Sequence, residues 1–417
     1  MRVLWLCNSV LEVISETLGT GAPVNGGWLN GYANELLAHT DIKLVICYPQ
    51  EETGSLQMAE GPKWSSVGFP RSWEFSNNDK LSKLFEKTLR EVMPDVIHLH
   101  GTEFPHCELM MKSAIALGLK ARVVASIQGL VSVCAEHLFD GIPRESWNIR
   151  TLSDAKNRLG LLRMKADYER RGVSEQHVIS ITPNIIGRTL WDEACCREIN
   201  KDIRYFHCGE ILRNQFYTAK AWCPNDSHAI FFSQGDKPIK SLHMLIHALG
   251  IIRRRYPDVK VIVSGSQGIR DDIVRGTGYG VYCGRLAKSL GVLDCFSFLG
   301  TVGPQSLIGA MLSCSCFVSS SAMENSSNAF GEAMMLGLPC VSSYVGGMPS
   351  MATDGSEALF YPYLEPNMLA SHVIRLFGNP DYAKRIGEAG RKRAQINHSK
   401  ERVRNDLVRI YELVSAC

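Results

Sequence analysis

Two glutamates separated by seven residues, Glu324 and Glu332, are the pair in this chain whose types and spacing best suit chemistry. They lie in the stretch ENSSNAFGEAMMLGLPCV, after an apolar run from Cys316 that predicts a buried strand. Gly337 and Pro339 predict the end of a short helix within this stretch. Eight residues along one helix would separate the two carboxylates by about 12 Å, too far for a close acid/base pair. We therefore expect Glu324 at the end of a loop that faces a ligand and Glu332 in the first helical turn.

The start of this predicted helix is suited to an anion. Asn328 is a residue type that caps helices, and the backbone N–H groups around it would be open donors at the positive end of the helix dipole. This places Ser327, Asn328 and Ala329 beside a phosphate. An ionised carboxylate only accepts hydrogen bonds, so Glu332 suits a diol next to that phosphate. These features predict a site for the phosphate, ribose and sugar of a sugar nucleotide. The alternatives are a Glu332 that only offsets the helix dipole and a Glu324 exposed on a loop.

The spacing of the two glutamates, followed by EAMMLGLPCV and then SSYVGGMP, resembles the signature of the family-4 retaining glycosyltransferases, also called glycosyl transferases group 1. That family has the two-domain GT-B fold. The resemblance implies that Glu332 holds the ribose hydroxyls and that Glu324 contacts the transferred sugar. It covers residues from about 231 to 411 closely and the first half of the chain loosely.

Apolar runs rich in Val, Ile and Leu alternate with helical stretches along the whole chain, as expected for an α/β protein with parallel strands buried on both faces. Ten strands, divided evenly between the halves, predict two doubly wound, Rossmann-like domains. Ligands of such sheets bind at the carboxyl ends of the strands. The predicted strands span residues 2–9, 42–49, 94–101, 122–129, 177–184, 228–235, 259–266, 295–303, 316–322 and 340–347.

The expected domain limits follow from this alternation, which breaks in the stretch HCGEILRNQFYTAKAWCPND. We expect an acceptor-binding domain at residues 1–206, a linker at 207–226, a donor-binding domain at 227–398 and a final helix at 399–417. The resemblance implies that the two domains face one another across a cleft and that the final helix crosses back to the first domain.

Two histidines end a predicted strand in PDVIHLHGTE, and alternation places His98 and His100 on one face. Two ligands without a third do not make a zinc site. The resemblance implies that His100 faces the donor sugar, whereas His98 is expected to be structural.

Three further positions in the first half are candidates. Gly26 and Gly27 end a loop before a helix, where the backbone can approach a ligand closely; the resemblance places this loop beside the donor phosphates, and an ordinary turn is the alternative. Gln128 stands where relatives often carry histidine, so proton transfer is not expected there. Arg188 follows another strand and is a candidate for contact with the acceptor or a phosphate, or a surface residue.

In the second half, the resemblance places Lys240 at the family's phosphate-binding lysine, where its ammonium would neutralise a departing diphosphate. Relatives add an arginine a few residues earlier, but this chain has Gln234 and Gly235 there, so Arg188, Arg270 or another residue would have to replace it.

Two glycine-bearing turns complete the predicted donor site, by analogy with the family. Thr301 and Val302 lie in a turn expected near the nucleobase. Gly346 and Gly347 lie in a turn expected near the sugar or the diphosphate.

Composition excludes several classes of protein. The chain of 417 residues is 45% hydrophobic and 21% charged with a net charge of +3, which gives no reason to expect nucleic acid as a partner. No apolar run is long enough for a membrane span. The fourteen cysteines lack zinc spacing. His243 and His247 are one helical turn apart, but no glutamate follows the first histidine, so the metalloprotease pattern fails. No metal or other cofactor is expected.

The sequence therefore predicts a retaining, metal-independent glycosyltransferase for a hexosyl or N-acetylhexosaminyl group, acting in polysaccharide or glycoconjugate (capsule or cell-envelope) biosynthesis. Its expected partners are a nucleotide-diphosphate sugar and a glycan or lipid-linked acceptor. We expect a cytoplasmic protein, with the basic stretch KNRLGLLRMKADYERR as a candidate for peripheral contact with the inner membrane face. The alternatives are a non-catalytic nucleotide-sugar-binding protein and a sugar-nucleotide epimerase of the same architecture.

Overall fold

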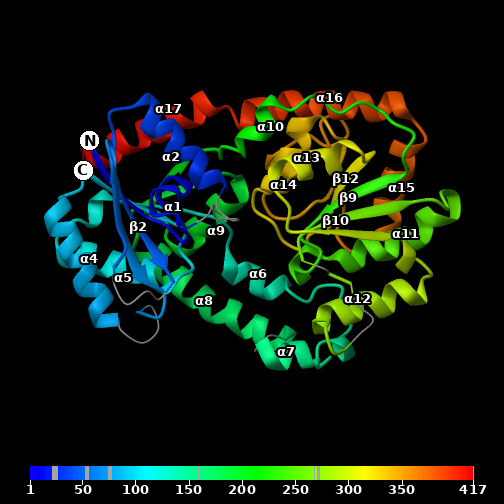
Figure 1. Ribbon diagram of the computed structural model, residues 1–417, viewed down its shortest axis with the longest axis horizontal. Coiled ribbons are helices and arrows are strands. Elements are labelled where there is room, and N and C mark those ends of the chain that lie inside the picture. The colour runs from blue at the N-terminus through cyan, green and yellow to red at the C-terminus, as the bar shows by residue number, and fades with distance from the viewer. Residues whose placement is uncertain are drawn as a thin grey trace. The chain divides into compact units, whose positions relative to one another are not determined.

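The computed structural model describes residues 1–20, 27–51, 56–73, 78–157, 160–266, 268–269 and 273–416. The chain forms two compact units, each built around its own sheet (Figure 1). Unit 1 comprises residues 1–132, 170–212 and 398–417, and unit 2 comprises residues 133–169 and 213–397.

Unit 1 contains an eight-stranded sheet in the order β3-β4-β2-β1-β5-β6-β7-β8. All neighbouring strands are parallel except β3, which pairs antiparallel with β4 at the edge. The central strands are buried along nearly their whole length, as their continuous apolar sequences predict. The strands are β1 (Arg2–Leu6), β2 (Lys43–Gln50), β3 (Met58–Gly61), β4 (Trp64–Pro70), β5 (Val96–His100), β6 (Val123–Ser126), β7 (Asn184–Gly187) and β8 (Arg204–His207).

The helices of unit 1 include the last helix of the chain, which packs on α2 and β5 (Figure 1). This helix, α17, buries Val403, Leu407 and Ile410 as its stripe predicts, but Leu413 is exposed and Tyr411 is buried instead. The helices are α1 (Glu12–Leu18), α2 (Gly27–His39), α4 (Asn78–Val92), α5 (Pro105–Ala116), η1 (Lys120–Arg122), the greater part of α8 (Leu161–Ile181), α9 (Leu190–Ile199) and α17 (Lys400–Ser415).

Unit 2 contains a six-stranded, wholly parallel sheet in the order β11-β10-β9-β12-β13-β14. The order reverses direction at β9, which lies between β10 and β12, and such a switch point is where open α/β sheets bind ligands. The strands are β9 (Ala229–Ser233), β10 (Lys260–Ser264), β11 (Phe296–Gly300), β12 (Cys316–Ser319), β13 (Cys340–Ser343) and β14 (Leu359–Tyr361).

Unit 2 also contains helices and short 3₁₀ turns, several of which connect its parallel strands, since parallel neighbours need long crossovers. They are η3 (Pro238–Lys240), α10 (Asn214–Thr218), α11 (Leu242–Arg255), α12 (Gly278–Ser289), η4 (Leu293–Cys295), α13 (Pro304–Leu312), α14 (Asn328–Leu336), η5 (Met348–Ser350), α15 (Pro366–Phe377) and α16 (Pro380–Asn397).

Residues 133–169 group with unit 2, whereas the sequence division placed them in the first domain. They contain most of α6 (Val131–His137), η2 (Arg144–Ser146), α7 (Leu152–Asn157) and the start of α8. The Asp154 carboxylate accepts a 2.7 Å hydrogen bond from the Gly278 amide, which ties α7 to the first turn of α12 (Figure 1). His243 Nε2 and Tyr363 Oη both donate to the Asp140 carbonyl, at 3.1 and 2.9 Å. Polar contacts therefore fasten this segment to unit 2.

One predicted strand is wrong. Residues 177–181 are the end of helix α8, and the strand β7 begins only at Asn184. Val178 and Ile179 are fully buried on the helix. A short apolar run is compatible with the buried face of a helix as well as with a buried strand. Five strands of the described structure were not predicted at their positions: β3, β4, β7, β8 and β14. In the part of the chain that the structure describes, no helix is both long and apolar enough to cross a membrane.

Candidate functional site

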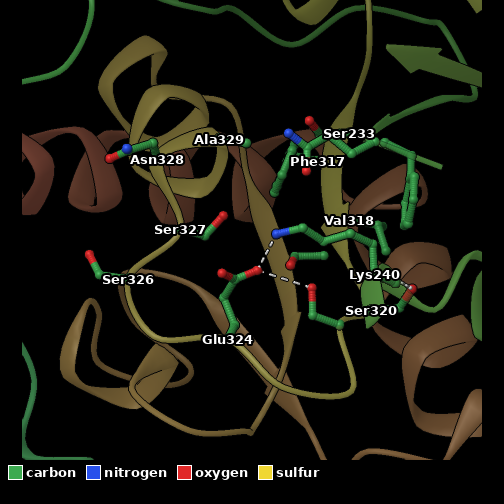
Figure 2. A pocket seen from close by; sticks show the side chains of 14 residues that line it. Ser233, Lys240, Phe317, Val318, Ser320, Glu324, Ser326, Ser327, Asn328 and Ala329 are labelled. Atoms are coloured by element: carbon green, nitrogen blue, oxygen red, sulfur yellow. Dashed lines mark hydrogen bonds and ion pairs between the residues drawn. The ribbon is translucent and has the colours of Figure 1, made fainter. Parts of the chain in front are cut away.

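A pocket of about 200 Å³ lies in unit 2 where β9 and β12 end, at the switch point of the sheet (Figure 2). Its lining is dominated by serine hydroxyls, and Lys240 is the sole cationic side chain among the described residues that line it. The lining residues are Phe232, Ser233, Gln234, Lys240, Phe317, Val318, Ser319, Ser320, Ser321, Glu324, Ser326, Ser327, Asn328 and Ala329.

Lys240 and Glu324 point toward one another across this pocket (Figure 2). Lys240 Nζ donates to Glu324 Oε2 in an ion pair, and Ser321 Oγ donates to the same oxygen at 3.3 Å. Lys240 ends the 3₁₀ turn η3, and the Ser320 hydroxyl fixes the backbone after it by donating to the Ser241 carbonyl at 2.8 Å. The two predicted residues thus meet in one site, each about four-fifths covered by protein.

The Gly346–Gly347 turn packs against the backbone of Glu324. Gly347 N donates to the Glu324 carbonyl at 3.0 Å. Gly346 has a positive φ of 49°, and a Cβ there would lie 2.1 Å from the same carbonyl oxygen. Only glycine fits this approach. The turn was predicted to approach the sugar or diphosphate, but neither glycine is among the residues that line the pocket; their contact is with the loop that carries Glu324.

Helix α14 begins at the pocket, and its first residues, Asn328 and Ala329, line it. The cap is Ser327, not Asn328 as predicted: the Ser327 side chain accepts from the Phe330 amide at 3.4 Å. Gly337 ends the helix in the left-handed conformation, which confirms that prediction. The amides of Asn328 and Ala329 have no hydrogen-bond partner among the described residues. They are open donors at the positive end of a nine-residue helix.

Glu332 lies in the second turn of α14, not in the first turn as predicted, because the helix starts at Asn328. It does not line the pocket and is 4% exposed. Arg213 binds it in bidentate fashion, Nε to Oε1 and Nη2 to Oε2, both at 2.6 Å. Burial raises the pKa of Glu332, and the two hydrogen bonds from the guanidinium oppose that rise.

Of the remaining residues predicted in the second half, some line the pocket and others lie outside it. Thr301 and Val302 follow β11 in a turn outside the pocket lining, and Thr301 is exposed. Gln234, which stands where an arginine was expected, does line the pocket, with a φ of 57°. Arg270, a predicted substitute for that arginine, lies outside the described residues.

In unit 1, His98 and His100 end strand β5 and are both fully buried. His98 is hydrogen-bonded on both ring nitrogens, to Tyr411 Oη at 2.7 Å and Ser126 Oγ at 2.6 Å, and burial lowers its pKa to about 3. His100 has no hydrogen bond on either nitrogen and packs against the rings of Trp5 and Trp28. Burial lowers its pKa well below the usual value, so it is a neutral imidazole. His98 therefore has the bonds of a structural residue, whereas His100 keeps unused polar atoms.

Arg188 is neither at the surface nor free for a ligand. Its guanidinium forms an ion pair with the buried Glu210 and donates to the carbonyls of Ile127 and Gln128, the latter at 2.7 Å. Both ionic partners are less than one-tenth exposed. Arg188 thus links the loop that carries Gln128 to the segment that carries Glu210. The Gln128 side chain itself is partly exposed.

Gly27 is the first residue of α2, so a helix starts at the second glycine of the predicted pair. Gly26 lies outside the described residues.

Among the residues that the structure describes, no group of three or more His, Cys, Asp or Glu side chains could hold a metal ion. His243 is buried with its Nδ1 accepting from Tyr279 Oη and its Nε2 donating to Asp140, a structural pattern.

The sequence analysis missed Arg213, which lies 119 residues from Glu332 in a stretch expected to be a linker. It also missed Glu210, the partner of Arg188, in the same stretch. The only sequence signal for Arg213 and Glu210 was that charged residues lie in the predicted linker. A sequence does not show their ion-pair partners, so they resemble ordinary surface residues.

Comparisons with known proteins agree with this geometry. Residues 218–393 match the family model described as glycosyl transferases group 1. Spore coat protein SA of Bacillus subtilis is 28% identical over 42% of this chain and 46% of its own length. A D-inositol 3-phosphate glycosyltransferase of Streptomyces coelicolor is 27% identical over 42% of this chain and 38% of its own. These matches therefore span less than half of the relatives' lengths.

A solved structure is similar over the whole chain. Anabaena HepE, determined in complex with UDP and glucose, superposes with a TM-score of 0.67 at 13% identity and covers 100% of both chains. At this identity the likeness concerns the fold, which is GT-B, as predicted. Residues 218–393 are thus similar to the glycosyl transferases group 1, and the chain has the GT-B fold.

Proposed function

We propose that this protein is a retaining, metal-independent glycosyltransferase that moves a sugar from a nucleoside-diphosphate donor to a hydroxyl acceptor. The observation that carries the proposal is the pocket at the switch point of unit 2, where Lys240, Glu324 and the open amides of α14 converge. An ammonium and helix N-terminal amides are groups that stabilise a departing phosphate. The family match covers this pocket, and HepE, which has the same fold, was determined with UDP and glucose.

Each residue has a proposed role. Lys240 and the amides of Asn328 and Ala329 bind the diphosphate, with the Ser327 hydroxyl beside them. Glu324 orients the transferred sugar, and Glu332 binds the ribose hydroxyls through its carboxylate oxygens. His100, neutral and with unused ring nitrogens, is proposed as a further polar contact for the sugar.

The proposed reaction keeps the configuration at the anomeric carbon. The bond from C1 to the diphosphate oxygen breaks while the acceptor oxygen bonds to C1 on the same face. An oxygen of the departing diphosphate takes the acceptor proton, so the products are a glycoside and a nucleoside diphosphate. The protein's part is to position the reactants and to stabilise the charge that develops on the leaving group. No residue is required as a covalent nucleophile.

The acceptor in this proposal is a glycan or a lipid-linked glycan, within polysaccharide or glycoconjugate synthesis at the cytoplasmic face of a membrane. The Streptomyces relative is named a D-inositol 3-phosphate glycosyltransferase, and the several hydroxyls of an inositol phosphate support a polyhydroxyl acceptor for this chain. The exposed Leu152 and Leu162, on α7 and α8, are candidates for the peripheral membrane contact.

A second candidate is a protein that binds a nucleotide sugar without transferring the sugar. It is favoured by one observation: Lys240 is the sole cation among the described lining residues, and Glu324 already neutralises it. Gln234 stands in the lining where the family resemblance implies an arginine.

A donor panel tests the proposal. The full chain is incubated with UDP-, GDP-, ADP- and dTDP-sugars, with and without acceptor fractions and with and without EDTA. We expect nucleoside diphosphate release that depends on acceptor, is unaffected by EDTA, and gives a product with the donor's anomeric configuration by NMR. Donor binding without turnover under every condition would support the second candidate, and an epimerised donor would identify an epimerase.

A further inference from the structure

The strongest unassigned feature is the ion pair between Arg213 and Glu332. Arg213 precedes the five-residue helix α10, and Glu332 lies on α14; the two helices pack together in unit 2 (Figure 1). Arg213 is placed by its guanidinium lying over the ring of Phe216, 5.1 Å from the ring centre, and Phe216 is fully buried. The arginine is therefore held by an aromatic ring against its planar group and by Glu332 at the edge of that group.

The geometry of the ion pair leaves half of the hydrogen-bond acceptor positions of the Glu332 carboxylate unoccupied. Two parallel N–H···O bonds of 2.6 Å occupy one lone pair on each oxygen of Glu332. A carboxylate offers about four acceptor positions, so one remains on each oxygen. Two acceptors on adjacent oxygens of a fixed plane match the two hydroxyls of a vicinal diol.

Ionisation of the carboxylate depends on the same contact. Glu332 is nearly fully buried while the Arg213 side chain is 31% exposed, so the arginine is the nearest compensating charge and lies on the solvent side. Without it, burial would favour the protonated carboxyl, which is a poorer acceptor and carries a donor of its own.

From this geometry, we propose that Arg213 is a positioning residue for the donor ribose, holding Glu332 ionised and oriented so that its remaining lone pairs accept the 2′- and 3′-hydroxyls. This inference rests on the proposed function and adds a residue to it. Arg213 itself does not touch the reacting atoms.

Nucleotide binding across pH tests the inference. Affinities of UDP, GDP and ADP, and of their 2′-deoxy counterparts, are measured by calorimetry at pH 6 to 9 for the unaltered protein, Arg213→Met, Arg213→Lys and Glu332→Gln. We expect Arg213→Met to weaken the preferred nucleotide about tenfold or more at pH 6, with recovery as pH rises and Glu332 ionises. The loss should be much smaller for the 2′-deoxynucleotide, and Arg213→Lys should restore part of the affinity.

The matched control is Arg253→Met, which removes a bidentate pair with Asp294 elsewhere in unit 2 and should leave nucleotide affinity unchanged at every pH. Tighter binding by Arg213→Met at all pH values would mean that Arg213 competes with the ribose, and would overturn the inference. Equal losses for ribo- and deoxyribonucleotides would also overturn it.

A measurement without nucleotide separates this inference from the proposed function. In urea unfolding, Arg213→Met should lose stability relative to the unaltered protein as pH rises from 5 to 8, because the unpaired Glu332 has its pKa raised further by burial. Adding Glu332→Gln should abolish that pH dependence, and a pH-independent difference would refute the ionic role of Arg213. If no nucleoside diphosphate binds the unaltered protein, the proposed function and the ribose role fail together, whereas the unfolding result still decides the ionic role.

Discussion

Lys240 donates to the carboxylate of Glu324 across the pocket of unit 2, so the sole cation among the described lining residues is neutralised by an acid in the same site (Figure 2). A bound diphosphate and a bound sugar would each draw one partner away from this pair. The ion pair therefore couples the proposed phosphate contact to the proposed sugar contact, and the two residues should behave differently when each is replaced.

Lys240→Met should weaken binding of the preferred nucleoside diphosphate about 10- to 100-fold, because a hydrogen bond to a charged group is worth roughly 1.5–3 kcal/mol. Lys237→Met is the matched control: Lys237 is three residues away, half-exposed and paired with Asp236 outside the pocket lining. Calorimetry with the nucleoside diphosphate measures both. Equal affinities for the two variants would remove Lys240 from the phosphate site.

Glu324→Gln should lower turnover at least tenfold while leaving nucleoside diphosphate affinity unchanged or higher. The amide fills the same space but releases Lys240 from its ion pair, so the lysine becomes more available to the diphosphate. Initial rates with the donor identified in the panel measure the first effect, and calorimetry measures the second. Glu388→Gln, at an exposed position on α16, is the control. A loss of affinity with unchanged turnover would contradict the assigned role.

One part of this pocket, residues 317–329, belongs to a short local stretch whose pattern the sequence displays. The strand end, the loop with Glu324, the cap at Ser327–Asn328 and the glycine at 337 all fall within about twenty residues, and each has a positional preference that a sequence displays. Lys240 came from the family resemblance, because no local pattern distinguishes a phosphate-binding lysine from a solvated one.

The contacts that the sequence could not supply are long-range. The Arg213–Glu332 pair joins residues 119 positions apart, and the packing of Gly346 on the Glu324 carbonyl depends on two loops meeting. The wrong strand at residues 177–184 has a different cause. Its short run of Val178, Ile179 and Ile181 suits a buried helix end as well as a strand, and only the preceding turns of α8 decide between them.

Gly346→Ala should disturb Glu324 without touching the ligand. An added Cβ would lie 2.1 Å from the Glu324 carbonyl oxygen, and the φ angle of residue 346 is positive. The turn must therefore shift, or the folded protein must carry the steric and backbone strain. We expect a destabilisation of about 2 kcal/mol or more together with lower turnover. Gly309→Ala is the control, because Gly309 lies within helix α13 with nothing within 4 Å and should be neutral or stabilising. Unfolding midpoints and initial rates measure both. Unchanged turnover in a destabilised Gly346→Ala would show that the turn supports the fold but not Glu324.

Buried neutral histidines should make the protein sensitive to acid. Burial lowers the pKa of His98 and His243 to about 3 and that of His398 to about 4, whereas an unfolded histidine titrates near 6.5. Below that value the unfolded chain binds protons that the folded chain does not, so the free energy of unfolding should fall as pH drops from about 6.5 to 4. For His398 alone the loss is on the order of 3 kcal/mol at its completion.

The variant His398→Gln tests this in a single residue. His398 Nδ1 donates to the buried Glu210 carbonyl at 2.8 Å, and a glutamine amide can donate there without titrating. Urea unfolding of the variant should therefore depend less steeply on pH between 6.5 and 4 than that of the unaltered protein. His39→Gln, at an exposed position on α2, should leave the slope unchanged. A slope that His398→Gln does not reduce would mean that the folded protein can protonate this ring, and that the acid sensitivity arises at other groups.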